Sequence, residues 1–315
     1  MTIQLPEKLY KYINLEWCKK YYEAIRLKKE TNLNIYEIAE ILNIERHSVS
    51  KWNRGIRKPF DIRSLEMIND SLTLEKAYIL GVLCGDGSIF VLNCNNGKHF
   101  IVKLEVIDKD FRDFFLKCLQ KYYHHGGKSE YIKNTSFGIV KTYCTISQHK
   151  GVFLDLARYG NFGTKTWRVP KEIFKSSNEI KYAFLRGLFD SDGGVTSVNK
   201  RFPDIILSSI NLKGTLEVQK LLINLGFNPL LQKFDNYGDR KIKYYRLHIN
   251  KKEDVIKYYK FIGFVIKRKQ ENLSNLIKNI NCDYYKIRRK DGTFSSERIR
   301  IEREIPQPTY QLKSY

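Results

Sequence analysis

Apolar residues recur with helical spacing in two short segments that lie a little more than one hundred residues apart. The segments run from Tyr78 to Gly87 and from Phe184 to Gly193, and each ends in an Asp-Gly pair. Small residues stand four positions apart in each segment and remove side-chain bulk from one helix face: Gly81 and Gly85, then Gly187 and Ser191. The pattern predicts two helices that pack backbone to backbone.

The acidic residue at the end of each predicted helix is the candidate chemistry. Gly87 and Gly193 suit the left-handed residue that stops a helix, which would place Asp86 and Asp192 at its last turn, where the helix dipole is already negative. If the helices pack in parallel, the two carboxylates meet, repel each other, and become tolerable beside a divalent cation. The repeat therefore predicts a metal site, against the simpler alternative of two ordinary helix ends.

Alternating apolar and polar residues after each motif predict strand pairs and covering helices. After the first motif we expect strands at 88–92, 99–106, 128–133 and 139–147, and helices at 111–119 and 150–159. After the second we expect strands at 195–198, 204–209, 230–234 and 242–249, a turn at 236–239, and helices at 212–225, 253–262 and 269–280. The same order of elements thus occurs twice.

Two further regions flank the repeats. In the basic, helical segment 1–70, the apolar spacing from Ile35 to Trp52 predicts a helix, a turn at Asn43 and a second helix. This segment resembles a helix-turn-helix DNA-binding unit, and the alternative is a helical hairpin that packs on the rest of the protein. Its outward face would present Arg46, His47, Ser50 and Lys51. Near the end of the chain, Asp291-Gly292 between basic β-prone runs predicts a hairpin that extends a nucleic-acid contact or only covers the core.

The composition adds a strong positive charge. The chain has 56 Lys+Arg against 34 Asp+Glu and a formal net charge of +22, which attracts a polyanion such as DNA, RNA or an anionic membrane. No apolar run approaches the ~20 residues of a spanning helix and no signal peptide opens the chain, so we expect no membrane partner and a cytoplasmic, nucleoid-associated or organellar-matrix location. The six dispersed cysteines indicate neither a disulfide framework nor a zinc finger.

Both motif segments resemble the LAGLIDADG motif of homing endonucleases. The second matches closely from Leu185 to Gly193, and the first departs at Cys84, where the family often has an earlier acidic residue. The resemblance extends over roughly residues 75–280. It implies an α+β fold of two pseudo-symmetric αββαββα repeats that form a DNA-binding saddle of antiparallel sheets, with a small all-α N-terminal domain. The expected boundaries are 1–70, 71–165, 166–281 and 282–315.

The resemblance also assigns roles. Asp86 and Asp192 would be direct ligands of Mg²⁺, with two or three divalent ions shared between them, and the product would be a staggered double-strand break across the minor groove. The family places a basic residue near each active site, and Lys109 and Lys213 match these positions best. The alternative is that each lysine is a solvated helix start, and Lys103 is an alternative to Lys109.

Polar and aromatic side chains on the predicted strand faces are candidate DNA contacts. On one face of a strand they offer donors and stackable rings, while Tyr245, Leu247 and Ile249 would face the core. The candidates are Lys103, Lys141, Tyr143, Thr145, Tyr244, Arg246 and His248.

Several conspicuous residues have a structural explanation. Asp190 fills the family's earlier acidic position, but its counterpart is Cys84, so we exclude Asp190 from the site and expect a hydrogen bond to local backbone. His124 is expected at a helix end, and Trp167 as an anchor of the linker between the repeats.

Three functions remain open. The first is a homing endonuclease that acts as a monomer on a long, specific DNA duplex without a small-molecule cofactor. The second is an RNA maturase that helps an intron fold, which would tolerate loss of the two acids although both are present. The third is a transcription regulator with a relic nuclease fold, favoured by the helix-turn-helix segment and disfavoured by the retained Asp pair. An intein-embedded nuclease is disfavoured because neither end of the chain resembles splicing blocks.

Overall fold

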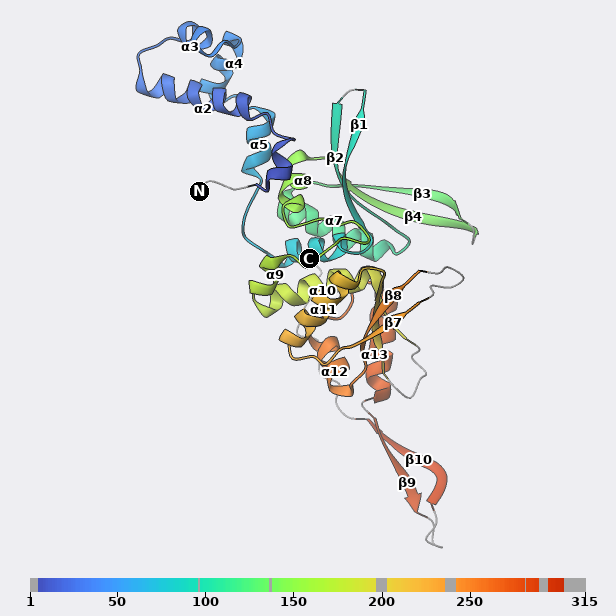
Figure 1. The fold of residues 1–315 in the computed structure, drawn as a ribbon. Coiled ribbons are helices and arrows are strands. Elements are labelled where there is room, and N and C mark those ends of the chain that lie inside the picture. Colours follow the sequence, from blue (N-terminus) through green and yellow to red (C-terminus); the bar gives the residue numbers. More distant parts are fainter. Residues whose placement is uncertain are drawn as a thin grey trace. The chain divides into compact units, whose positions relative to one another are not determined.

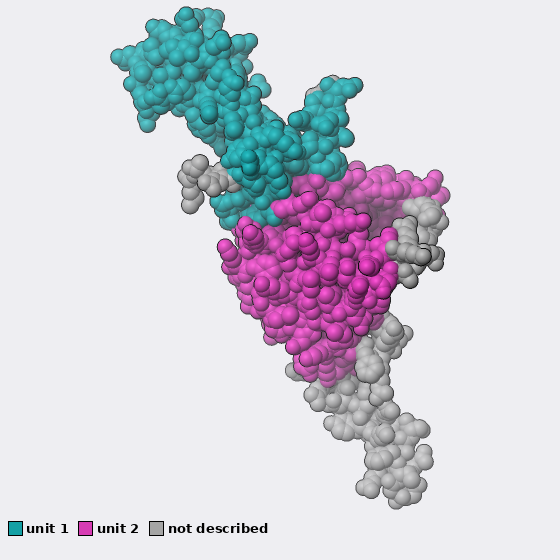
Figure 2. Space-filling model, in the orientation of Figure 1, with its two compact units in different colours: residues 1–71, 90–102, 147–159 teal, residues 72–89, 103–146, 160–315 magenta. Residues whose placement is uncertain are grey.

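The computed structural model describes residues 5–95, 97–135, 138–196, 203–235, 242–280, 282–288 and 294–302, the last two ranges by their backbone alone. The chain forms two compact units (Figure 2). One comprises residues 1–71, 90–102 and 147–159, and the other comprises 72–89, 103–146 and 160–315. The domain boundaries predicted from the sequence stay a prediction.

The first unit contains the predicted helix-turn-helix segment. Its helices are α1 (Glu7–Tyr10), α2 (Leu15–Glu30), α3 (Ile35–Leu42), α4 (Arg46–Asn53), α5 (Phe60–Glu66) and α8 (Lys150–Ala157) (Figure 1). A capping box opens α3, because the Asn34 side chain accepts from the backbone N–H of Glu37 while the Glu37 carboxylate accepts from that of Asn34. Asn43 turns the chain in the left-handed conformation at φ 48°. On α4, Val49 and Trp52 are buried, and the Trp52 ring packs edge-on against Trp17 of α2 with centroids 5.2 Å apart. The predicted pair of helices is confirmed.

Two four-stranded sheets with the same strand order confirm the α+β fold class. The first contains β1 (Gly87–Cys94), β2 (Gly97–Val106), β3 (Gly127–Thr135) and β4 (Gly138–Ser147) in the order β1-β2-β4-β3. The second contains β5 (Gly193–Val195), β6 (Ile205–Ser209), β7 (Leu230–Phe234) and β8 (Tyr244–Ile249) in the order β5-β6-β8-β7. On β8, Leu247 and Ile249 are fully buried, as their alternation predicts. On β2 the alternation is less strict, because Ile101 is buried together with Phe100 and Val102.

The remaining helices belong to the second unit. They are α6 (Leu74–Leu83), α7 (Lys109–Tyr123), α9 (Lys171–Lys175), α10 (Asn178–Asp192), α11 (Leu212–Asn224), α12 (Lys252–Phe261) and α13 (Lys267–Ile280). His124 ends α7 in the left-handed conformation, and Trp167 is buried with its carbonyl bonded to Asn211 at 2.6 Å, as expected. The C-terminal hairpin consists of β9 (Cys282–Arg288) and β10 (Phe294–Glu302), while the predicted turns at 236–239 and 291–292 lie outside the described residues.

The motif helices α6 and α10 pack backbone to backbone, as their small residues predict. A Cβ atom on Gly81 would overlap the carbonyl oxygen of Phe184, and one on Gly187 would overlap that of Tyr78. Farther along both helices, a Cβ on Gly85 would overlap Ser191. The contact positions advance together along both segments, so the two helices run in parallel and their carboxyl ends meet.

The glycines after the two motifs have a different role from the predicted one. Gly193 is extended at φ −96° and ψ 169°, and neither it nor Gly87 is among the described glycines with positive φ. They are needed because the strands β1 and β5 start against their own helices: a Cβ on Gly193 would lie 2.6 Å from the Phe189 ring. Asp192 is the last residue of α10, whereas α6 ends at Leu83 and Asp86 follows in a turn, so the predicted last-turn placement holds for Asp192 alone.

Among the described residues, no helix is long and apolar enough to cross a membrane. Cys18, Cys84, Cys94, Cys118 and Cys144 are free thiols, which agrees with the predicted lack of a disulfide framework in the part of the chain that these residues cover.

Candidate active site

The two motif aspartates meet where α6 and α10 end. A Cβ placed on Gly85 would lie 3.2 Å from Oδ2 of Asp192, so that carboxylate lies against the turn that carries Asp86. Both aspartates keep an exposed surface that an ion or a phosphate can reach, although protein atoms crowd around their carboxylates. The juxtaposition predicted from the repeat is therefore present in the structure.

The surrounding protein opposes ionisation of this pair. Burial among protein atoms and the neighbouring charge of Asp86 raise the pKa of Asp192 to about 7, although the charge of Lys269 acts in the opposite direction. Burial also raises the pKa of Asp86; Lys269 lowers it and Asp108 raises it further. Because two like charges share one site, the pair retains a proton to higher pH than an isolated carboxylate would.

A lysine that the sequence interpretation did not assign to the site lies beside both acids. Lys269 of α13 is buried, and its Nζ donates to the carbonyl oxygens of Asp190 at 2.5 Å, Phe189 at 3.2 Å and Ser191 at 3.3 Å. These carbonyls form the negative end of α10, so the ammonium offsets the helix dipole next to Asp192.

The sequence does contain a signal for Lys269. It shares one buried helix face with Leu273, Leu276 and Ile277, at spacings of four, seven and eight residues. A lysine on an otherwise apolar face requires partners in the interior, and burial accordingly lowers the pKa of Lys269.

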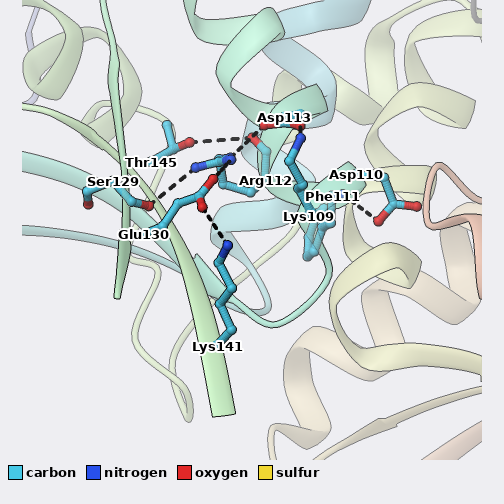
Figure 3. Close-up of polar contacts among 9 residues, drawn as sticks. All are labelled: Lys109, Asp110, Phe111, Arg112, Asp113, Ser129, Glu130, Lys141 and Thr145. Carbon is cyan, nitrogen blue, oxygen red and sulfur yellow. Dashed lines mark hydrogen bonds and ion pairs between the residues drawn. The ribbon is translucent and has the colours of Figure 1, made fainter. Parts of the chain in front are cut away.

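The two lysines predicted as catalytic lie differently. Lys109 opens α7 and pairs with Asp113 at 2.6 Å (Figure 3), and Lys213 is an exposed residue in the first turn of α11. Neither is among the charges that shift the pKa of Asp86 or Asp192, whereas Lys269 shifts both. A catalytic role for Lys109 and Lys213 stays a prediction.

Asp190 has a structural role, as expected because its counterpart in the first motif is Cys84. Its buried carboxylate accepts from the Tyr78 hydroxyl of α6 at 2.9 Å and from the backbone N–H of Val265 at 3.0 Å. The expected hydrogen bond to local backbone was wrong, because this backbone donor lies 75 residues away. Burial raises the pKa of Asp190 to about 6 despite these bonds. Asp190 therefore joins both motif helices to the segment that leads into α13.

The donor set fits a hard divalent cation. Within the described ranges, no group of three or more His, Cys, Asp and Glu side chains could hold a metal ion by itself. Mg²⁺ nevertheless is commonly held by one or two carboxylates, with waters and substrate phosphates completing its shell. Two accessible carboxylates that repel each other provide such a partial shell, and a cation between them would relieve the repulsion.

The predicted DNA contacts on β4 require one correction. Thr145 is fully buried, and its hydroxyl donates to the carbonyl oxygen of Arg112 in α7, so it has no surface to offer to DNA (Figure 3). The alternation of β4 places Tyr143 and Lys141 on the same face. Tyr143 lies 5.3 Å from the buried Arg112 guanidinium, and Lys141 pairs with Glu130 at 2.9 Å. Side chains two residues apart lie on the same face of a strand, so Lys141 and Tyr143 share the face of Thr145, which packs on α7.

On the second sheet, the predicted contacts lie on the face opposite the buried Leu247 and Ile249. Arg246 is bonded to Ser208 at 3.3 Å and lies over the Phe234 ring at 5.2 Å. His248 is buried, in contrast to the surface position that was expected, and contacts Asp204 at 2.9 Å. Tyr244 stacks on Phe234 with centroids 4.7 Å apart. Contact of Tyr244, Arg246 and His248 with DNA stays a prediction.

The other candidates are placed as follows. Arg46 and His47 are exposed on α4, with Ser50 and Lys51 partly buried. Arg46 donates to the Tyr36 hydroxyl at 2.7 Å, so this cation is already positioned by its own unit. Lys103 is half-buried and pairs with Glu105. Their contact with DNA is likewise still a prediction.

Comparisons with known proteins agree with this architecture. The family model described as LAGLIDADG-like domain matches residues 179–263. The chain is 26% identical over 285 residues to the uncharacterized protein MJ0398 of Methanocaldococcus jannaschii, covering 82% of this chain and 93% of that protein. It is 33% identical over 162 residues to the ribonucleoside-diphosphate reductase NrdEB subunit alpha of Bacillus subtilis, covering 48% of this chain but 14% of the subunit.

Among solved structures, the crystal structure of I-DmoI in complex with DNA and Mn is similar with a TM-score of 0.44 and 16% identity, covering 61% of this chain and 97% of that chain. The matched family region, residues 179–263, contains α10, the second four-stranded sheet and α12. The resemblance found in the sequence is confirmed over these residues, which match the LAGLIDADG-like domain.

Proposed function

We propose that the chain is a site-specific endonuclease that hydrolyses phosphodiester bonds of double-stranded DNA with divalent metal ions. The observation that carries this proposal is the meeting of Asp86 and Asp192 at the carboxyl ends of two parallel helices, both exposed to solvent. Two ordinary helix ends would not bring repelling acids together, so the arrangement favours a site that a cation completes.

Asp86 and Asp192 would hold the metal ions. A divalent cation held there would polarise the phosphodiester and lower the pKa of an attacking water. Asp192 must lose its proton for this, and with its pKa raised to about 7 it does so near neutral pH. Lys269 contributes by offsetting the negative end of α10 and favouring the ionised form of both acids.

Duplex DNA is the substrate that best fits the charge and the sheets. A formal net charge of +22 favours a polyanion, and the major groove of B-DNA admits a two-stranded β-ribbon. The deep, narrow major groove of A-form RNA does not admit side chains in this way, which favours the nuclease over the RNA maturase. Because one chain contains both motif helices, we propose that it acts as a monomer. The relatives' own activities do not transfer, since the reductase similarity covers 14% of that subunit.

Selection from a randomised duplex library tests the proposal. We expect cleavage of a long, specific sequence in Mg²⁺, and binding of the same sequence without cleavage in Ca²⁺. Asp86→Asn and Asp192→Asn should abolish double-strand cleavage with binding retained, and each single change should leave nicking, because each acid serves chiefly one strand. Asp70→Asn changes an exposed acid that pairs with Arg158, away from every candidate site residue, and serves as the control. Sequence-specific binding in Mg²⁺ without any cutting would contradict the proposal.

A transcription regulator is the second candidate, because α3 and α4 form the predicted helix, turn and helix. In that function the helices bind DNA and the aspartates are inert. The same selection separates the two functions, since a regulator binds a specific duplex in both ions and cuts in neither.

A further inference from the structure

Three side chains from two strands of the first sheet converge on one carboxylate. Glu105 of β2 accepts from Lys103 of the same strand at 2.5 Å and from Lys133 of β3 at 3.2 Å. Tyr131 of β3 also donates to it. Because β4 lies between β2 and β3, the side chains of Tyr131 and Lys133 reach across it. The small Thr142 of β4 lies opposite Tyr131 in the register and is buried.

This cluster lies on the face of the sheet that points away from α7. The register pairs Lys133 with Val140, whereas the adjacent pair of Ile132 and Lys141 points to the other face. That other face carries Glu130, which binds Arg112 of α7 (Figure 3). The Glu105 cluster is partly exposed, with the Lys133 side chain 56% accessible.

The charges of the cluster fit a ligand that has both hydrogen-bond acceptors and a donor better than they fit a phosphate, which has acceptors alone. Hydrogen bonds from Lys103 and Tyr131 lower the pKa of Glu105 to about 2, so the cluster carries two ammonium groups and one carboxylate near neutral pH. A phosphate that drew the lysines away would leave the carboxylate unpaired beside a polyanion. A ligand that offers both acceptors and a donor satisfies all three groups at once.

In the major groove, a G·C pair is such a ligand. Guanine presents the adjacent acceptors O6 and N7, which lysine binds, and cytosine presents an N4 amino donor, which glutamate accepts. An A·T pair offers adenine N7 without a second adjacent acceptor, and asparagine or glutamine matches it best.

We propose that Lys103, Glu105 and Lys133 read a G·C pair, with Glu105 accepting from the cytosine amino group and a lysine donating to guanine. This inference rests on the duplex DNA binding of the proposed function. It goes further by naming a residue set that determines specificity and the base pair that it selects.

The test measures affinity in Ca²⁺ for the selected duplex and for a series in which each base pair is replaced in turn. For the wild-type protein, replacing one G·C pair should weaken binding about 5- to 150-fold, the range for loss of a bidentate base contact. In Glu105→Gln this penalty should fall to about 3-fold or less, and preference at that position should shift toward A·T, because an amide pairs with adenine. Lys133→Met should reduce the same penalty and leave the other positions unchanged.

Lys121→Met provides a control. Lys121 of α7 is also an exposed lysine that pairs with a glutamate, at 67% accessibility against 56% for Lys133, but it lies on a helix outside the sheet. We expect Lys121→Met to leave the base preference at every position unchanged. Thermal unfolding of all variants shows whether each one retains the fold.

An unchanged base profile in Glu105→Gln would overturn the inference, and so would a loss of affinity spread evenly over all positions. An affected position that prefers A·T in the wild-type protein would do the same. Base preference is measured from binding in Ca²⁺, and cleavage is measured separately in Mg²⁺. A base preference that changes in Glu105→Gln, with no cleavage by the wild-type protein, would contradict the endonuclease proposal alone. Cleavage with an unchanged base preference would contradict the reading of a G·C pair alone, and a lack of any sequence-specific duplex binding would contradict both.

Discussion

Replacing Asp192 by asparagine should stabilise the protein at alkaline pH while removing a proposed metal ligand. Burial and the charge of Asp86 raise the pKa of Asp192 from the ordinary 3.8 to about 7, so ionisation costs the folded state free energy that the unfolded chain does not lose. Below about pH 4 the residue is protonated in both states and the cost is absent. The cost grows as the pH rises from 3.8 and is complete above 7. The asparagine variant therefore gains stability over that window.

The size of the gain follows from the shift. Roughly three pKa units at about 1.4 kcal/mol each give a ceiling of about 4 kcal/mol. Asp192 is exposed to solvent, and screening by water reduces the effect, so we expect a gain of about 1–2 kcal/mol at pH 8 and a smaller one at pH 5.

Urea unfolding with a chelator present, at pH 5 and pH 8, measures this difference. Asp113→Asn is the control of opposite sign: although burial acts to raise it, hydrogen bonds from Lys109 and Arg112 lower the pKa of Asp113. That variant should therefore lose stability at pH 8. An Asp192→Asn variant that is less stable than wild type at pH 8, or equally stabilised at both pH values, would refute the reasoning.

Three further changes test the packing and the site. Gly187→Ala forces a Cβ into the carbonyl of Tyr78 and should cost at least about 3 kcal/mol in urea unfolding, whereas Gly194→Ala, which meets no atom within 4 Å, should change stability by less than about 0.5 kcal/mol. Lys269→Met should reduce single-turnover cleavage by roughly 100-fold or more, and a drop below about 5-fold would show that its charge is dispensable. Tyr78→Phe removes a donor from buried Asp190 and should cost about 1–3 kcal/mol in thermal unfolding, and a neutral result would contradict the bridging role of that hydrogen bond.

The sequence was most informative where local pattern and packing agree. Gly81 and Gly187 predict the close helix pair because only small residues allow backbones to meet, and the structure shows that approach. Leu247 and Ile249 predict their own burial because side chains alternate across a strand.

What the sequence did not provide depends on contacts between distant segments. Lys269 reaches the end of α10 from a helix that starts 75 residues after Asp192, and periodicity alone does not say which helix end it meets. Thr145 was expected at a DNA surface because alternation reveals which residues share a face, but not which face α7 covers. The Asp-Gly pattern predicts that Gly193 stops a helix, whereas the close approach of β5 to Phe189 explains this glycine.

The central claim is that Asp86 and Asp192 together hold divalent cations against a DNA duplex. Anomalous diffraction from crystals of the protein with its selected duplex and Mn²⁺ tests it most directly. The account predicts anomalous peaks within coordination distance of both carboxylates and of a phosphate oxygen. Manganese bound elsewhere, or a bound duplex with no manganese at this pair, would contradict it.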